Sequence, residues 1–308
     1  GLWPDSKKTT TQKGILELEE LGYNLFYIGK NADLYTCAGD EAKVLLVRSD
    51  RCSVFDIPLN LLIEGKGVSQ TAISNNGAAF AKESGIRTAI LSEIVDQSLA
   101  IAPRCQLMEL CKPLEANVDG DIVQFELIFR NYLTGSLFDA CQNGSDPYGL
   151  DLPAGLEQWH KFETPIFTPT TKGIKDEPLN SAKVRELFPE IVTNLEKLFK
   201  DFTIFAEQRG IIVVDTKFEI FVNSKGEWVL GDEVLTPESS RFISKEDFDA
   251  KNYISMDKQI LRDFGKADNW KEKAKELKSG EKLEVNVPQS IKDKILSGYT
   301  TILNRLSK

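Results

Sequence analysis

Charged and uncharged residues alternate along 215–219, which together with residues 231–241 is the most informative part of the chain. Residues 211–214 are a β-branched run that predicts a buried strand, and Asp215-Thr-Lys-Phe-Glu219 continues it. Residues two apart in a strand point to the same face, so the charged residues of this run are expected to share one face. That face carries Asp215, Lys217 and Glu219, and the other carries Val214, Thr216, Phe218 and Ile220.

A turn signal follows at residues 223–226, and residues 227–235 are expected to form the returning strand of a hairpin. If the pairing is symmetric about the turn, Glu219 falls opposite, or nearly opposite, Asp232. Two carboxylates held together in this way either repel each other or hold a cation. The alternative is a solvent-facing strand with alternating charge, and geometry alone leaves both interpretations open.

The remaining periodicity predicts an α+β fold. Near the N-terminus we expect a short helix over 16–21 and a meander of three strands over 23–28, 32–37 and 42–47. The bend at Gly29-Lys30-Asn31 is suited to covering a bound phosphate chain.

Further along, helices and strands alternate, and the Pro-, Thr- and Gly-rich segment 150–180 is expected to be an ordered functional loop. Pro189 suits the first turn of a helix, so one helix should end by Phe188 and another, with an apolar stripe, should run to about Gly210. The other expected strands are 87–91, 105–115 and 122–130, and the other helices are 67–84, 136–141, 257–264, 270–277 and 288–306.

Composition limits the class of protein. The chain has 308 residues, 41% of them hydrophobic, which is enough for a substantial core in one or two domains. A net charge of -9 argues against broad binding to nucleic acid or acidic membrane, so anionic ligands would need basic residues focused in a cleft. No apolar run reaches a membrane span, and the first eight residues lack a signal-peptide core. The start at Gly1, without methionine, is interpreted as a remnant of processing or cloning.

Cysteine and histidine usage excludes several kinds of site. The five cysteines are scattered without a C-x-x-C pair, which favours reduced thiols in a cytoplasm over disulfides or a zinc site. His160 is the only histidine, so histidine-driven hydrolysis would have to use it, and a surface or structural role is favoured. The sequence contains no P-loop, no G-x-G-x-x-G fingerprint and no G-x-S-x-G elbow.

Six motifs occur in a specific order along nearly the whole chain. They are residues 50–56 (DRCSVFD), 129–136 (FRNYLTGS), 167–172 (FTPTTK), 215–219 (DTKFE), 232–241 (DEVLTPESSR) and 255–259 (SMDKQ). Together they resemble the phosphoribosylaminoimidazole-succinocarboxamide synthase (SAICAR synthetase) family of purine biosynthesis. The resemblance implies an ATP-dependent ligase that joins L-aspartate to the carboxylate of carboxyaminoimidazole ribonucleotide, giving SAICAR, ADP and phosphate. It also implies a small N-terminal antiparallel sheet lobe (1–115) and a larger α+β C-terminal part (116–308) enclosing an ATP cleft.

The resemblance also implies roles for individual residues. Glu219 and Asp232 would hold Mg²⁺, Lys217 would steady the transferring phosphoryl group or the substrate carboxylate, and Asp215 would accept from ribose hydroxyls. The ribonucleotide would be bound by Arg130, Ser136 and Arg241 at its phosphate and by Asp56 at its imidazole. On the ATP side, Lys30 is expected near the phosphates and Glu126 nearer the adenine or ribose. From the residues alone, a surface arginine at the end of a strand is the favoured interpretation of Arg130, and Lys66 and Lys172 are either anion contacts or solvated lysines.

Two departures from the family pattern concern ATP and aspartate handling. Ala32 stands where a second basic residue is usual, and residues 173–177 lack the commoner acidic pattern. Lys43, on the neighbouring predicted strand, is one candidate for replacing the missing charge. Two alternatives remain, a small-molecule or protein kinase and a nucleotide-binding relative without turnover. The first lacks an H-R-D-type loop, and the second is motivated only by Ala32.

Overall fold

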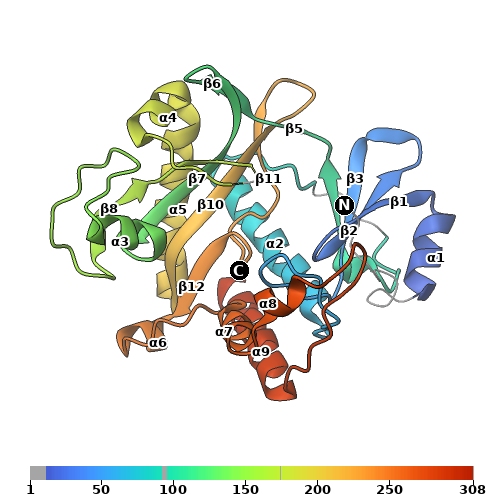
Figure 1. Ribbon diagram of the computed structural model, residues 1–308. Coiled ribbons are helices and arrows are strands. Elements are labelled where there is room, and N and C mark those ends of the chain that lie inside the picture. The colour runs from blue at the N-terminus through green and yellow to red at the C-terminus, as the bar shows by residue number, and fades with distance from the viewer. Residues whose placement is uncertain (1–11, 92–95, 174, 308) are drawn as a thin grey trace. The chain divides into compact units, whose positions relative to one another are not determined.

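The computed structural model describes residues 12–91, 96–173 and 175–307 (Figure 1). Contacts divide the described chain into two compact units. Unit 1 comprises Gly1–Asn76, Ala89–Leu110 and Ile254–Lys308, and unit 2 comprises Gly77–Thr88 and Cys111–Tyr253. The expected division at residue 115 is contiguous in sequence, unlike these units, and it stays a prediction, as does the ATP cleft. The interpretation of residues 1–8 lies outside the described residues.

Unit 1 contains a four-stranded antiparallel sheet in the order β1-β2-β3-β4. The first three strands confirm the predicted meander, and α1 lies against β1. Buried side chains, among them Leu18, Tyr35 and Leu45, form its core. The elements are α1 (Gln12–Glu20), β1 (Tyr23–Ile28), β2 (Ala32–Cys37), β3 (Asp40–Arg48) and β4 (Cys105–Glu109).

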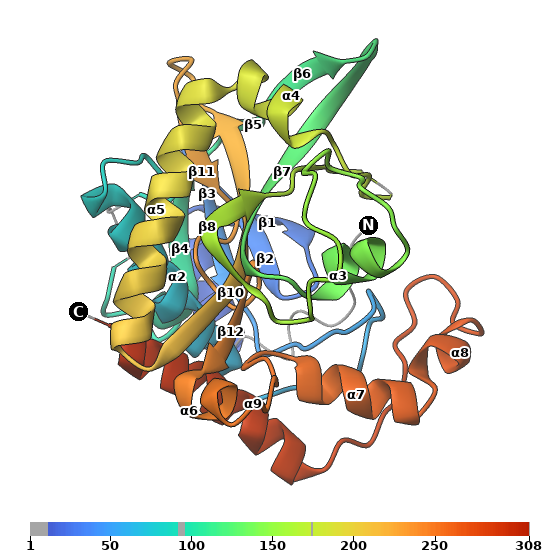
Figure 2. The ribbon, with the colours of Figure 1, turned by 90° about the vertical axis from the view of Figure 1, so that its left-hand side faces the viewer.

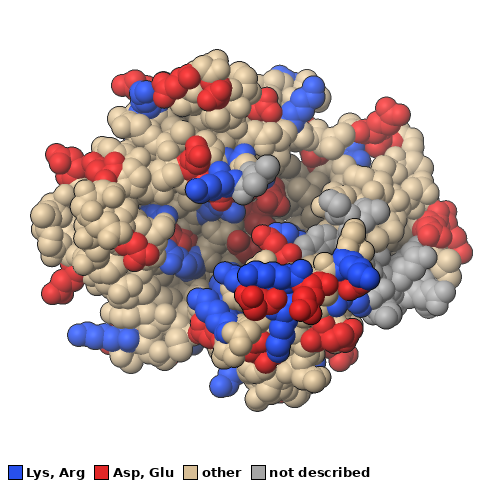
Figure 3. Space-filling view, viewed as in Figure 1, with Lys and Arg blue, Asp and Glu red and all other residues tan. Residues whose placement is uncertain are grey.

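The rest of unit 1 is mainly helical. It includes η2 (Ala102–Arg104), the first part of α2 (Lys66–Glu83), α7 (Gln259–Ala267), α8 (Trp270–Ala274) and α9 (Gln289–Leu306). Trp270 is fully buried and packs on Phe264 and Gly265, where a Cβ would meet the indole at 2.4 Å. On the outer surface of α7 and α8, acidic and basic side chains interleave, so neither sign forms a broad patch there (Figure 3).

Unit 2 is built on an antiparallel sheet whose central strands are β7 and β10. Helix α5 lies across one face of it (Figure 2). The ring of Phe129 on β7 packs against the rings of Phe167 on β8 and Phe199 on α5. The strands are β5 (Lys112–Pro113), β6 (Glu115–Val118), β7 (Asp121–Tyr132), β8 (Lys161–Phe167), β9 (Thr170–Thr171), β10 (Ile211–Val222), β11 (Trp228–Gly231) and β12 (Ser240–Ser244). The helices are α3 (Gly135–Gln142), α4 (Ser181–Leu187), α5 (Pro189–Gln208) and α6 (Lys245–Asp249).

The junction of α4 and α5 confirms the prediction based on Pro189. Helix α4 is capped by Asn180, whose side chain accepts from the backbone of Lys183 at 3.0 Å, and α5 begins at Pro189. The predicted apolar stripe is buried at Ile191, Leu195, Leu198, Phe199 and Phe202.

Three expectations about strands are corrected. Residues 87–91 form no strand, only isolated bridges at Thr88 and Ile90. The predicted long strand 105–115 is three short ones, because β4 pairs with β3 in unit 1 while β5 pairs with β10 in unit 2. The predicted returning strand 227–235 ends at Gly231, because Asp232 turns into the left-handed region with φ 54°.

Strands β8 and β9 and helix α6 were not expected from the sequence. The loop expected over 150–180 contains β8 and β9, and α6, capped by Ser244, was not predicted. His160 is exposed with its ring edge-on to Phe162, and the five cysteines, all within the described chain, are free. None of the described helices has the length and apolar character of a membrane span.

Candidate active site

The register of unit 2 brings the predicted charged residues together. On β10 and β7, Asp215 pairs with Arg130 and Glu219 with Glu126. On β10 and β11, Glu219 pairs with Gly231, so Asp232 is one residue from the position directly opposite. This confirms the expectation that the hairpin sets Glu219 nearly opposite Asp232.

Three acidic side chains therefore cluster at this end of the sheet. Glu126 and Glu219 are buried, whereas Asp232 is accessible to solvent although protein surrounds it closely. Desolvation and the charges of Glu219 and Glu233 raise the pKa of Asp232. Burial likewise raises the pKa of Glu126, with the negative charges of Asp176 and Glu219 adding to it and Lys217 opposing it. The cluster thus favours binding of positive charge.

Two lysines lie close to these carboxylates and partly neutralise their charge. Lys172 Nζ donates to Glu219 Oε2 at 2.6 Å, and Lys217 Nζ lies 3.7 Å from Glu126 Oε1 and 3.8 Å from Glu219 Oε1. Burial lowers the pKa of Lys172, but its hydrogen bond and attraction to Glu219 raise that pKa overall. Lys172 is exposed to solvent and pairs with a carboxylate of the cluster, so a contact with an anionic substrate stays a prediction.

Glu219 and Asp232 have the chemistry that Mg²⁺ requires. Mg²⁺ prefers oxygen ligands and commonly takes one or two carboxylates, leaving its other positions to water and phosphate oxygens. Within the described residues, no group of three or more acidic, histidine or cysteine side chains is arranged to hold a metal ion. An adjacent carboxylate pair, with Asp232 open to solvent, fits an ion held jointly by protein and nucleotide.

A second cluster centres on Asp215, which binds two guanidinium groups. Arg241 Nε donates to Asp215 Oδ1 at 2.9 Å, and its Nη2 also contacts Oδ2. Arg130 Nη1 lies 3.4 Å from Asp215 Oδ2, while its Nε donates to Thr168 Oγ1 at 2.9 Å. Arg130 is buried, which excludes the surface alternative. Since its oxygens accept from arginines here, Asp215 orients both cations, and its expected ribose contact stays a prediction.

The start of α3 adjoins this cluster. Gly135 has φ 60°, and a Cβ there would approach Arg241 Nη1 to 3.2 Å, so the arginine lies directly against the helix start. Ser136 follows in the first turn and is exposed. Free backbone N–H groups at a helix start favour anions, as does the adjacent guanidinium. The three predicted phosphate ligands are thus brought together.

The two remaining predicted site residues, Lys30 and Asp56, lie in unit 1. Their exposed side chains form an ion pair, although the resemblance implied different substrates for them. Hydrogen bonds from Arg51 hold the bend that carries Lys30. Arg51 Nη2 donates to Gly29 O at 2.8 Å and to Asp33 Oδ1 at 2.7 Å. Ser49 Oγ adds a bond to Asn31 O at 2.8 Å.

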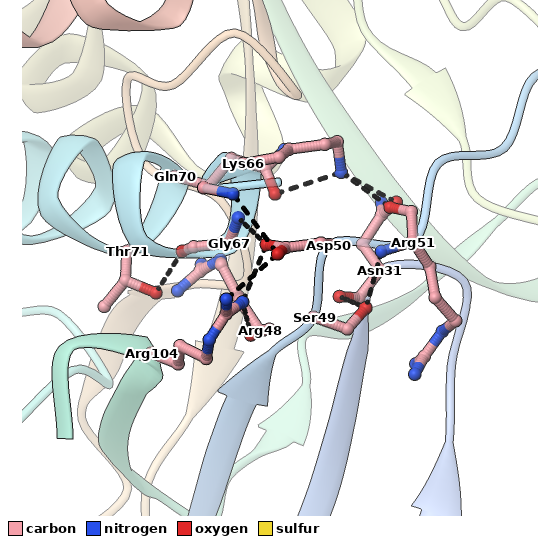
Figure 4. A network of polar contacts seen from close by, with 11 residues as sticks. Asn31, Arg48, Ser49, Asp50, Arg51, Lys66, Gly67, Gln70, Thr71 and Arg104 are labelled. Atoms are coloured by element: carbon pink, nitrogen blue, oxygen red, sulfur yellow. Dashed lines mark hydrogen bonds and ion pairs between the residues drawn. The ribbon is translucent and has the colours of Figure 1, made fainter. Parts of the chain in front are cut away.

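A buried network extends this support toward α2 (Figure 4). Lys66, fully buried, donates to Arg51 O at 2.9 Å, which excludes a solvated lysine. Asp50 accepts from Arg104 Nη1 at 2.7 Å and from the backbone of Gly67 at 3.0 Å. Burial raises the pKa of Asp50, but these hydrogen bonds lower it overall, so the carboxylate stays charged. Sequence reasoning missed this network, although the two glycines around Lys66 signalled a close approach.

Lys43 is wrongly placed to replace the charge missing at Ala32. Ala32 pairs with Arg48 on β3, whereas Lys43 pairs with Glu109 on β4. Lys43 and Arg48 are five residues apart along β3, about 16 Å in an extended strand. Lys43 instead lies 3.5 Å from Asp40.

Comparisons with known proteins show the family to which the chain belongs. A phosphoribosylaminoimidazole-succinocarboxamide synthase of Desulfotalea psychrophila is 33% identical over 264 residues, covering 80% of this chain and 85% of that protein. The enzyme of the same name from Neisseria meningitidis serogroup B is 32% identical and covers 94% and 100%. A SAICAR-synthase structure from Saccharomyces cerevisiae, complexed with SAICAR, superposes with a TM-score of 0.73 at 29% identity, covering 96% of each chain. The profile of the SAICAR synthetase family matches residues 25–277, and the chain therefore belongs to this family of purine-biosynthesis ligases.

Proposed function

We propose that the chain joins L-aspartate to the carboxylate of carboxyaminoimidazole ribonucleotide, with ATP converted to ADP and phosphate. The observation that carries this proposal is the arrangement in unit 2. One cluster is the pair of carboxylates at the β10–β11 hairpin, which lies close to two lysines. The other is the start of α3, against which an arginine lies, beside strands β7 and β10. The Saccharomyces cerevisiae relative is complexed with SAICAR, which supports SAICAR as the product here.

The chemistry explains the need for these residues. A carboxylate is a poor electrophile, so its oxygen first attacks the γ-phosphorus of ATP and releases ADP. The aspartate amine then attacks the acyl carbon, loses a proton, and phosphate leaves. A Mg²⁺ ion held by Glu219 and Asp232 would supply charge neutralisation on the phosphates. Lys217 Nζ, beside Glu126 and Glu219, can direct its charge at the transferring group, where negative charge migrates.

Substrate binding is assigned to the second cluster and to unit 1. Arg130, Arg241 and the first turn of α3 would bind the ribonucleotide phosphate, because forked donors and free N–H groups both suit it. Asp56 would face its imidazole. Lys30 would contact the ATP phosphates, and Glu126 the adenine or ribose. Free cysteines support a cytoplasmic location for this chemistry.

ADP release is expected to require both the ribonucleotide and L-aspartate, and to yield the succinocarboxamide. The measurement is coupled ADP release with each co-substrate omitted in turn, together with mass detection of the product. Equal ADP release without aspartate would indicate a kinase or an ATPase instead. Tight ATP binding without turnover would indicate a non-enzymatic relative.

Ala32→Arg is expected to lower the KM for ATP, with a smaller effect on the KM for aspartate. The family pattern sets a cation here beside Lys30, and a charge-assisted hydrogen bond corresponds to about 10-fold or more in affinity. Lys43→Ala is the matched control and should leave the ATP KM unchanged, because Lys43 lies at the far end of β3. If Ala32→Arg leaves the KM for ATP unchanged, the expected position of this bend over the ATP phosphates is wrong.

A further inference from the structure

The turn that carries Asp56 has an unusual backbone. Ile57 N donates to Val54 O at 3.0 Å, and the two residues between them, Phe55 and Asp56, have φ of 55° and 57°. A turn with both central residues in the left-handed region normally uses Gly, Asn or Asp. Phe55 is a bulky residue with no such preference, so this conformation is strained and must be held by its surroundings.

The residues on either side anchor the turn within unit 1. Val54 and Ile57 are buried, and they form a bridge with each other. The side chain of Asp56 is 75% exposed and points its carboxylate toward Lys30. The buried Val54 and Ile57 thus anchor the turn, and the carboxylate of Asp56 points outward from it.

Two lysines from the C-terminal segment contact the turn. Lys258, just before α7, is buried and donates from Nζ to Ser53 O at 3.3 Å. Lys271, on α8, sets its Nζ 4.6 Å from the ring centroid of Phe55, within cation–π range. One lysine therefore fixes the residue that enters the turn, and the other fixes its strained aromatic residue.

We propose that Lys258 and Lys271 are positioning residues that hold this turn so that Asp56 is preorganised for the ribonucleotide substrate. The proposal rests on the proposed function, which assigns Asp56 to that substrate. Without the two contacts, Phe55 would relax toward negative φ, and the adjoining Asp56 would rotate with it. The free protein would then populate the binding geometry less often, which weakens apparent affinity.

The test measures the KM for the ribonucleotide, the KM for ATP, kcat and Tm in a set of variants. Lys271→Met should raise the ribonucleotide KM about two- to five-fold, the range expected for an exposed cation–π contact, and leave the ATP KM unchanged. Lys271→Arg should restore the wild-type value, because guanidinium also binds aromatic faces. Phe55→Leu should reproduce the effect of Lys271→Met, and the double variant should add nothing further.

Further variants separate positioning from general stability. Lys273→Met is the matched control on α8: Lys273 pairs with Asp268 at 3.1 Å, so the ribonucleotide KM should stay at the wild-type value. Lys258→Met should raise this KM about ten-fold or more, since it removes a buried charged donor. Because that variant removes a buried group and can fail to fold, the exposed Lys271 series decides the question by itself.

The outcomes also separate this inference from the proposed function. If Asp56→Asn leaves the ribonucleotide KM unchanged, the role of Asp56 is wrong and the positioning role is overturned with it. If Asp56→Asn raises the KM while Lys271→Met lowers only Tm, Asp56 binds the substrate and the lysine is merely structural. A raised KM in both, restored by Lys271→Arg, supports the inference.

Discussion

Glu219→Gln and Asp232→Asn are each expected to slow turnover roughly 100-fold or more. Each substitution removes one anionic oxygen of the adjacent pair, Glu219 on β10 and Asp232 just after β11, while nearly preserving side-chain shape. The loss should be larger at limiting Mg²⁺, because the remaining carboxylate binds the ion alone. Turnover as a function of Mg²⁺ concentration is the measurement.

The matched control is Glu227→Gln on the same hairpin. Glu227 is separated from the pair and lies 3.4 Å from Arg87, so its loss should leave the Mg²⁺ dependence unchanged. Both site variants should remain folded, as judged by Tm, because removing a carboxylate relieves the desolvation and the repulsion that raise the pKa of Asp232. Near-wild-type turnover of both variants at limiting Mg²⁺ would make these carboxylates structural.

Arg241→Ala and Lys217→Met are expected to have opposite kinetic signatures. Arg241→Ala should raise the ribonucleotide KM by about 100-fold with little change in kcat, because two charge-assisted hydrogen bonds to a remote phosphate are lost. Lys217→Met should lower kcat by about 100-fold or more with little change in KM, because its charge acts where charge develops.

Arg185→Ala provides a control in the same unit, since Arg185 pairs at 3.2 Å with Glu196 rather than with a carboxylate of either cluster. Steady-state kinetics with the ribonucleotide varied separates the two signatures. An unchanged ribonucleotide KM in Arg241→Ala, or full activity in Lys217→Met, would contradict the corresponding assignment. Arg241→Lys is expected to recover only part of the affinity, because lysine lacks the forked donors.

Elements with strong local signals were predictable from the sequence. The β-branched run from Ile211 and the alternation from Asp215 to Glu219 predicted strand β10 correctly, and Pro189 predicted the boundary between two helices. The near-opposition of Glu219 and Asp232 followed from the hairpin alone. In each case the signal lies within a few residues, where strand periodicity and helix-start preferences act directly.

Features that depend on distant partners were not predictable. The run 105–115 has strand character throughout, yet its two ends pair with different sheets. Lys66 and Arg51 look like ordinary cations in the sequence, but both point inward, to backbone carbonyls that only the folded chain brings near. The pairing of Lys30 with Asp56 likewise depends on two separate turns meeting.

Unit 1 is discontinuous in sequence, so it cannot be completed until the end of the chain has been synthesised. Residues 53–76 contact the last segment: Leu59 bridges to Leu283, Asn76 bonds to Ser307, and Lys258 bonds to Ser53. Unit 2, in contrast, ends at Tyr253. Domains commonly fold in order of synthesis, but here the part of unit 1 around these residues must wait for the final helices, while unit 2 can finish first. A stalled chain ending near residue 253 should therefore resist protease in unit 2 and be cleaved near residues 53–65, whose partners are missing.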